Sequence, residues 1–150
     1  PWADPELKGA LIGLTLGTDA PRLFRALVEA TAFGSKATAE EFKKQGLAVQ
    51  EVIAQGGIPD KNPFVMQVTA DVLNMPIKTV RSNQAVALGA AMFASVVSGV
   101  YSNIHEAQTA MSSGYKRVFE PDPGNAAHYE VSYTKYLETG EKLGPILRNL

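Results

Sequence analysis

The sequence of 150 residues contains no cysteine, which excludes disulfide bonds and thiolate metal sites. It has no apolar run near the ~18 residues that a membrane-spanning helix needs, and no signal peptide opens it. The formal net charge of −1 lacks the basic surplus that is typical of nucleic-acid-binding domains. We therefore expect no nucleic-acid partner, no membrane partner and a cytoplasmic location.

The composition itself is that of an ordinary globular protein. Hydrophobic residues make up 45% of the chain and charged residues 19%. This length suits a single domain with its own core. The first residues, Pro1 to Pro5, lack an initiator methionine and are typical of the middle of a loop. We therefore expect the chain to be a piece of a longer protein.

Short apolar segments alternate with helical patterns along the first two thirds of the chain. The order strand, helix, strand, helix, strand, helix favours a parallel α/β sheet with right-handed crossovers. The expected strands are residues 10–16, 49–54 and 77–80, and the expected helices are residues 21–44, 63–73 and 84–98. The remainder is expected to be helical at 103–111 and from Asn125 onward, with an extended segment at 115–119 before two chain-breaking prolines, Pro121 and Pro123.

Spacing and end residues predict how these helices pack. In the first helix, residues at spacings of three and four are expected to face the core: Phe24, Leu27, Val28, Thr31, Ser35, Thr38 and Phe42. A similar stripe in the last helix contains Tyr129, Tyr133, Tyr136 and Leu137. Asn62 suits a helix cap before Pro63, and Ser82 or Asn83 is the candidate cap of the third helix. Gln67 and Asp71 share a helix face, either as a solvated stripe or as hydrogen-bonding groups that hold a neighbouring loop.

Two adjacent glycines, Gly56 and Gly57, follow the second expected strand. They could serve only a turn that needs positive φ. However, ligands of open α/β sheets bind at the carboxyl ends of strands, where backbone N–H groups can approach a phosphate. The spacing matches neither a Walker A loop nor a GxGxxG fingerprint, which disfavours a dinucleotide site. Asn62 either caps the next helix or serves the ligand, and we do not expect it to do both.

The residues show no catalytic group. There is no Ser-His-Asp arrangement, no HExxH motif and no pair of carboxylates with catalytic spacing. The pattern alone therefore predicts an α/β domain with a phosphate-facing turn, no catalytic residue and no metal ligand.

Three blocks of sequence then resemble the C-terminal domain of the FGGY family of carbohydrate kinases. The first is residues 9–15 followed by 23–29, the second joins Gly56-Gly57 to Asn62 and residues 66–76, and the third joins Gln84 to residues 87–91. The resemblance covers nearly the whole chain. Within the family, isoleucine after the glycine pair and glutamine at position 84 are similar to the branch that phosphorylates ribulose.

The resemblance implies an α/β, actin-like ATPase (ribonuclease H-like) domain, incomplete, with a short, mainly parallel sheet. Residues 1–150 would be the nucleotide-binding C-terminal domain of a two-domain kinase that transfers the γ-phosphoryl of ATP, with Mg²⁺, to a pentulose sugar. The backbone at Gly56 and Gly57 would approach the α-phosphate or ribose, and Asn62 would reach the adenine. No carboxylate here matches the family's general base, so we expect the chain alone to be inactive.

Two alternatives to this interpretation stay open. The chain could be a non-catalytic interaction domain with the actin-like fold, or it could belong to a kinase of another sugar or polyol, such as xylulose, glycerol or gluconate. Exposed apolar surface on an isolated lobe would also favour a homodimer.

Overall fold

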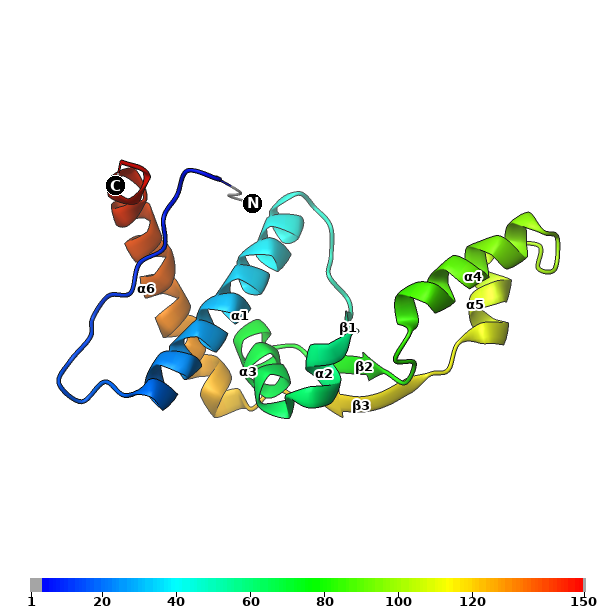
Figure 1. Ribbon diagram of the computed structural model, residues 1–150, viewed down its shortest axis with the longest axis horizontal. Helices are drawn as coiled ribbons and strands as arrows, with labels where there is room; N and C mark the ends of the chain where they lie inside the picture. Colours follow the sequence, from blue (N-terminus) through cyan, green and yellow to red (C-terminus); the bar gives the residue numbers. More distant parts are fainter. Residues whose placement is uncertain (1–3, 150) are drawn as a thin grey trace.

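The computed structural model describes residues 4–149, so the part of the expected N-terminal loop from Pro1 to Ala3 lies outside the described residues. In this part of the chain six helices and three strands follow one another. They are α1 (Ala20–Lys44), β1 (Val52–Ala54), α2 (Gly57–Lys61), α3 (Pro63–Leu73), β2 (Ile77–Val80), α4 (Ala85–Val97), α5 (Ile104–Met111), β3 (Tyr115–Phe119) and α6 (Pro123–Arg148). Figure 1 shows α1, α3 and α6 on one side of the small sheet and α4 and α5 on the other side.

The three strands form one mixed sheet in the order β1-β2-β3. β1 runs parallel to β2, with Val52 opposite Ile77, whereas β2 and β3 are antiparallel, with Ile77 opposite Phe119. The pairing is irregular after Thr79, because Thr79 lies opposite Arg117 but Val80 lies opposite Tyr115. Lys116 is therefore an extra residue in β3, which makes a β-bulge. The sheet is small and only partly parallel, because β3 returns antiparallel to β2.

The segment of residues 10–16, expected to be a buried strand, is not a strand. Its backbone is irregular, and Leu11, Ile12, Leu14 and Leu16 are exposed. A strand is stable only when a neighbouring strand takes up its N–H and C=O groups. The sheet of the described residues contains only β1, β2 and β3, so no neighbouring strand pairs with residues 10–16, although the segment is apolar.

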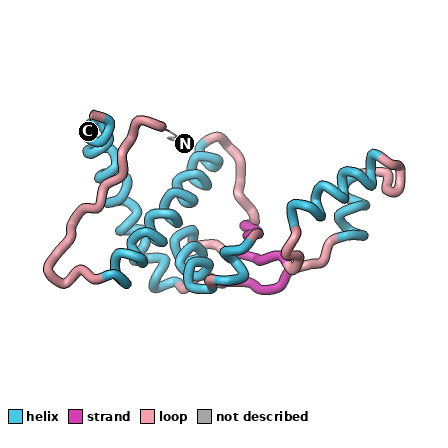
Figure 2. Tube along the Cα trace, in the orientation of Figure 1, coloured by secondary structure: helices cyan, strands magenta, loops and turns pink. Residues whose placement is uncertain are grey.

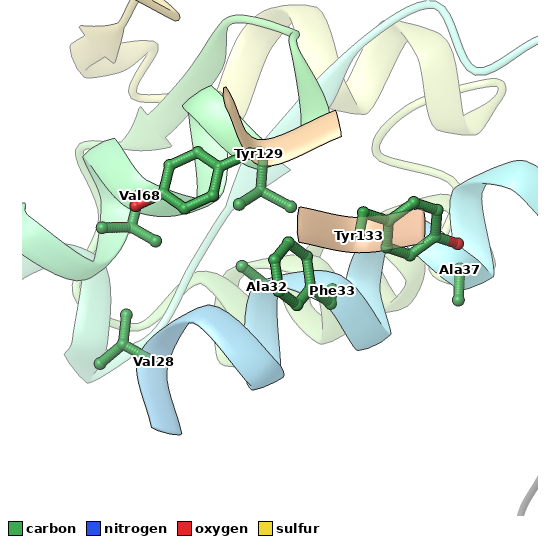
Figure 3. Packing of buried hydrophobic residues seen from close by; sticks show 8 residues of the cluster. Val28, Ala32, Phe33, Ala37, Val68, Tyr129 and Tyr133 are labelled. Atoms are coloured by element: carbon green, nitrogen blue, oxygen red, sulfur yellow. The ribbon is translucent and has the colours of Figure 1, made fainter. Parts of the chain in front are cut away.

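The main core lies where α1, α3 and α6 meet. Figure 3 shows Phe33 of α1 between the rings of Tyr129 and Tyr133 of α6. The Phe33 ring centroid lies 6.2 Å from that of Tyr129, 5.7 Å from that of Tyr133 and 5.3 Å from that of Tyr136. Such aromatic pairs add to the free energy gained by burial. Tyr129 and Tyr133 are buried and Leu137 packs against them, which confirms these positions of the expected stripe as a core face, whereas Tyr136 is 41% exposed.

The expected core face of α1 is largely wrong. Only Val28 of that stripe is buried, while Phe24, Leu27 and Phe42 are about half exposed. The buried face of α1 instead carries Val28, Ala32, Phe33, Lys36 and Ala37. This face lies against Val68 and Val72 of α3 as well as against Tyr129 and Tyr133 of α6. Apolar residues on two faces of α1 made the spacing ambiguous.

A second cluster joins the sheet to α3 and contains Met66, Ala70, Ile77 and Phe119. Gln67 and Asp71 on α3 hold the loop after β3. Gln67 Nε2 donates to Asp71 Oδ1 and to the backbone carbonyl of Glu120, both at 2.8 Å. The Asp71 carboxylate also accepts from the backbone N–H of Asp122 at 2.8 Å and from Asn125 Nδ2 at 2.9 Å. Of the two interpretations of this pair, the loop-holding one is confirmed.

The helix ends follow the local sequence, with two corrections. Pro123 does not break the chain but is the first residue of α6, where Asp122 accepts from the backbone N–H of Asn125 at 2.8 Å. Gln84, rather than Ser82 or Asn83, occupies the cap position of α4, without a side-chain cap bond. The Ser82 hydroxyl instead accepts from the backbone N–H of Gln84 at 3.2 Å. Gln84 precedes α4, so this bond does not cap an N–H group of the helix itself.

α4 and α5 form a helical hairpin that projects from the sheet, away from α1 and α6 (Figures 1 and 2). The outer side of α4 leaves Val86, Phe93 and Val97 exposed. Among the described helices, none combines the length and the hydropathy that crossing a bilayer requires.

Candidate functional site

The glycine turn, residues 56–61, begins where β1 ends. Gly56 has φ +99° and ψ −166°, a backbone conformation that side chains with a Cβ rarely adopt. Gly57 is the first residue of α2 and does not have a positive φ. A Cβ added at either glycine would meet no atom within 4 Å. The backbone conformation therefore explains glycine at position 56, whereas neither conformation nor packing within the described chain explains it at position 57.

Asn62 lies between α2 and α3 and caps α3. Its Oδ1 accepts from the backbone N–H of Val65 at 3.3 Å. The expected cap is therefore confirmed. The cap uses only Oδ1, and within residues 4–149 the side-chain Nδ2 makes no hydrogen bond, so this nitrogen can still donate to another group.

A cavity of about 550 Å³ opens at the carboxyl ends of β1 and β2, in the angle between the sheet and the α4–α5 hairpin. Gln55, which follows β1 and precedes Gly56, lines it. Further polar side chains come from the region of α5 and β3, including Gln108, Ser112 and Tyr115. The volume is in the range of small-molecule sites. Gly56, Gly57 and Asn62 do not line this cavity themselves, so the structure joins it to the glycine turn only through Gln55.

A smaller cavity of about 250 Å³ lies between α2 and the sheet. Pro59 and Asp60 line it from α2, and Thr79, Lys116 and Arg117 line it from β2 and β3. Lys116 Nζ donates to Asp60 Oδ1 at 2.7 Å across it. The chain from Gln55 to Pro63 thus contributes Gln55 to the larger cavity and Pro59, Asp60 and Pro63 to the smaller one, whereas the two glycines and Asn62 line neither.

Neither cavity contains the groups that proton transfer or metal binding would need. No Asp, Glu or His lines the larger cavity, and the one carboxylate of the smaller cavity, Asp60, is paired with Lys116. Within residues 4–149, no three His, Asp or Glu side chains converge closely enough to hold a metal ion. The arrangement can bind a ligand, and the described residues supply no general base beside it.

The shifted pKa values belong to groups in structural contacts. Burial and then the hydrogen bond to Glu40 raise the pKa of Tyr133, and burial raises the pKa of Tyr129. Both tyrosines lie between α1 and α6, where the Tyr129 hydroxyl donates to Glu29 Oε1 at 2.9 Å. Perturbed pKa values often mark active sites, but here they mark a helix interface.

The sequence indicated the turn but not the rest of the site. Gln108, Ser112 and Tyr115 are far from the glycines in sequence, and they line the larger cavity because α5 and β3 follow α4 back to the ends of β1 and β2. Isolated Gln, Ser and Tyr residues in a polar helix and loop carry no signal of their own. Only the fold could bring them into one cavity with Gln55.

Comparison with known proteins identifies the group to which this arrangement belongs. Residues 1–98 match the family model for the C-terminal domain of the FGGY family of carbohydrate kinases. The ribulokinase of Vibrio parahaemolyticus is 43% identical over 146 residues, which are 97% of this chain and 26% of that protein. The ribulokinase of Halalkalibacterium halodurans is 44% identical over 145 residues, with 94% of this chain and 26% of that protein covered. The chain thus spans about a quarter of the length of these relatives.

Solved structures give the same answer for the fold. A xylulose kinase from Lactobacillus acidophilus superposes with a TM-score of 0.83 at 28% identity, covering 94% of this chain and 28% of that one. A gluconate kinase from the same organism superposes with a TM-score of 0.80 at 28% identity, covering 93% and 28%. The expected α/β, actin-like ATPase class is therefore confirmed, with a mixed rather than mainly parallel sheet in the described residues. Together, these matches show that the chain belongs to the FGGY family of carbohydrate kinases.

Proposed function

We propose that residues 1–150 are the nucleotide-binding C-terminal domain of a two-domain, cytoplasmic kinase that phosphorylates ribulose with ATP, in arabinose catabolism. The ribulokinases that match nearly the whole chain at 43% and 44% identity support this choice of sugar. The partners are then ATP and a pentulose, with neither nucleic acid nor a membrane involved. The net charge of −1 is consistent with a small-molecule enzyme.

One observation carries the proposal. Gly57 has no positive φ, and a Cβ there would meet no atom within 4 Å. Glycine in a helix is less favourable than alanine by up to about 1 kcal/mol, so the fold of this chain gains nothing from it. A ligand that touches the backbone at this position does explain it, because a Cβ would hold the ligand away. The position at the carboxyl end of β1 is where ligands bind in such sheets.

The residues of the turn then have separate tasks. Gly56 turns the chain away from β1, and the backbone at Gly56 and Gly57 lies against the α-phosphate or ribose of ATP. Asn62 can donate from Nδ2 to the adenine while its Oδ1 caps α3. The earlier choice between capping and ligand binding is therefore unnecessary, because the two tasks use different atoms.

Mg²⁺ is part of the proposed substrate as Mg·ATP. The described residues do not fit a resident metal, since no three His, Asp or Glu side chains converge in residues 4–149. We therefore assign no metal ligand in this chain. Its residues bind and orient the nucleotide, and the general base for the sugar hydroxyl is not among those that line the cavities.

Titration calorimetry of the 150-residue chain with Mg·ATP tests the proposal. Saturable binding is expected, and Asn62→Asp should weaken it, because aspartate still caps the helix but cannot donate to adenine. Asn103→Asp, which makes the same change at the exposed cap of α5, is the matched control for binding. A chain that releases no heat with Mg·ATP would favour the non-catalytic interaction domain instead.

A second measurement concerns catalysis. Incubated with Mg·ATP and L-ribulose, the 150-residue chain should form ADP no faster than the buffer, because no carboxylate lines the larger cavity. Turnover near that of an intact sugar kinase would contradict the proposal.

Xylulose is the second candidate sugar, because the chain is similar to the L. acidophilus xylulose kinase. Comparing the two pentuloses as substrates of the longer kinase would decide between them.

The exposed Val86, Phe93 and Val97 of α4 favour a homodimer of the isolated chain, which light scattering would detect.

A further inference from the structure

We propose that Lys116 is a positioning residue that holds the glycine turn in place through Asp60. The inference rests on the proposed function, since it concerns how the turn is presented to a nucleotide. It goes beyond that function by assigning a task to a residue of β3, outside the three blocks of family resemblance.

Packing does little to hold the glycine turn. α2 has only five residues, none of them buried, and Ile58 is 61% exposed. The cavity of about 250 Å³ separates α2 from β2 and β3 where a packed interface would otherwise be. A short helix without buried side chains gains little from the hydrophobic effect, so its position depends on other contacts.

The ion pair of Lys116 with Asp60 is such a contact. Lys116 Nζ lies 2.7 Å from Asp60 Oδ1, and it joins α2 to β3 across the smaller cavity. Among the hydrogen bonds of residues 4–149, this is the one that a side chain of α2 makes with the sheet. The turn is otherwise tied only by its chain neighbours, β1 before it and the capped α3 after it.

The bulge in β3 explains why Lys116 reaches α2. Arg117 pairs with Thr79 and Tyr115 pairs with Val80, so Lys116 is the one residue of β3 between them without a partner in β2. Bulges change the direction of a side chain and are common beside active sites. In a regular strand, side chains alternate between the two faces, so Lys116 and Phe119, three residues apart, would point to opposite faces of the sheet. The bulge removes this restriction on Lys116.

The size of the effect follows from exposure. The Lys116 side chain is 53% exposed and that of Asp60 is 28% exposed, so water screens the pair. Pairs of this kind change an equilibrium by about two- to fivefold. We therefore expect Lys116→Ala to raise the Kd for Mg·ATP by about two- to fivefold without unfolding the chain.

Hydrogen–deuterium exchange on the 150-residue chain, with and without Mg·ATP, tests this inference. Without nucleotide, Lys116→Ala and Asp60→Asn should each speed exchange in residues 56–62 by about two- to fivefold, and the double variant should add little. Lys116→Arg should restore the slow exchange, because arginine can keep the ion pair. The control is Lys78→Ala, which removes a similar exposed ion pair, with Glu51, on the same sheet.

The nucleotide then separates positioning from general stability. In a titration with Mg·ATP, the concentration that half-protects residues 52–62 should rise with Lys116→Ala, stay at the wild-type value with Lys78→Ala and return with Lys116→Arg. Unchanged exchange of residues 56–62 in Lys116→Ala would overturn the inference. Faster exchange with an unchanged Mg·ATP titration would overturn the nucleotide role of Lys116. A wild-type chain that Mg·ATP never protects would instead overturn the proposed function, whatever the variants do.

Discussion

Replacing Gly57 by alanine separates the needs of the fold from those of a ligand. Alanine is favoured over glycine in a helix by up to about 1 kcal/mol. The added Cβ meets no atom within 4 Å and needs no unusual φ, so no strain offsets this gain. Gly57→Ala should therefore leave the chain as stable as the wild type or more stable. A gain of 1 kcal/mol corresponds to a rise in Tm of about 2–4 °C for a chain of this size.

The same methyl group should weaken nucleotide binding. Forcing one extra methyl group into a close contact typically costs about 1–3 kcal/mol. Since about 1.4 kcal/mol is a factor of ten, the Kd for Mg·ATP should rise about fivefold to about 150-fold. Thermal unfolding and titration calorimetry on the same preparation measure both effects.

Gly56→Ala is the matched control, because it adds the same Cβ to the neighbouring glycine. Gly56 has φ +99° and ψ −166°, a conformation almost exclusive to glycine, so alanine is strained there and the variant should lose about 1–3 kcal/mol of stability. Opposite signs for the two variants are therefore expected in the unfolding experiment. If Gly57→Ala binds Mg·ATP as tightly as the wild type, contact with the nucleotide cannot be the reason for glycine at position 57, and the proposal is refuted.

Three further predictions concern stability, each measured by urea unfolding. Phe33→Ala should cost about 3–5 kcal/mol, because it empties a buried site between three tyrosine rings. Asp71→Asn should lower the free energy of unfolding by about 2–3 kcal/mol, because it places an NH₂ group among N–H donors. The control Asp19→Asn, at an exposed helix cap, should change it by less than about 0.5 kcal/mol. The raised pKa of Tyr133, due first to burial, means that the unfolded chain ionises first, so stability should be complete below pH 10.0 and fall as the pH rises above it. Tyr133→Phe should make that alkaline loss shallower, and an equally steep loss would contradict this origin.

Local chemistry allowed much of the secondary structure to be predicted from sequence. Asn62 and Pro63 placed the start of α3, and Gly46, which has φ +81°, follows the end of α1. Such ends depend on a few neighbouring residues and on their own hydrogen bonds, so they are visible in sequence. The expected strand at 10–16 failed because a strand depends on a partner elsewhere in space.

The parts that could not be predicted depend on contacts between distant segments. The buried face of α1 is the one that meets α3 and the tyrosines of α6, and apolar residues on both faces of α1 made it ambiguous in the sequence. The antiparallel return of β3 and its bulge arise from pairing with β2. The glycine turn was visible in the sequence because two adjacent glycines after an apolar segment are an unusual local pattern. Lys116 and Gln108 are common surface residues, and only the fold places them at the cavities.

The packing of α1 against α6 also governs the order in which the chain can fold. The hydrogen bonds between these helices join residues 93 to 104 positions apart. Closing a loop of this length costs conformational entropy before any contact repays it, which slows folding. During synthesis, at about 5–20 residues per second, α1 therefore waits about 5–20 s for α6 to emerge. Throughout that interval Phe33 lacks the tyrosine rings of α6, so the main core stays incomplete until the last helix has been made.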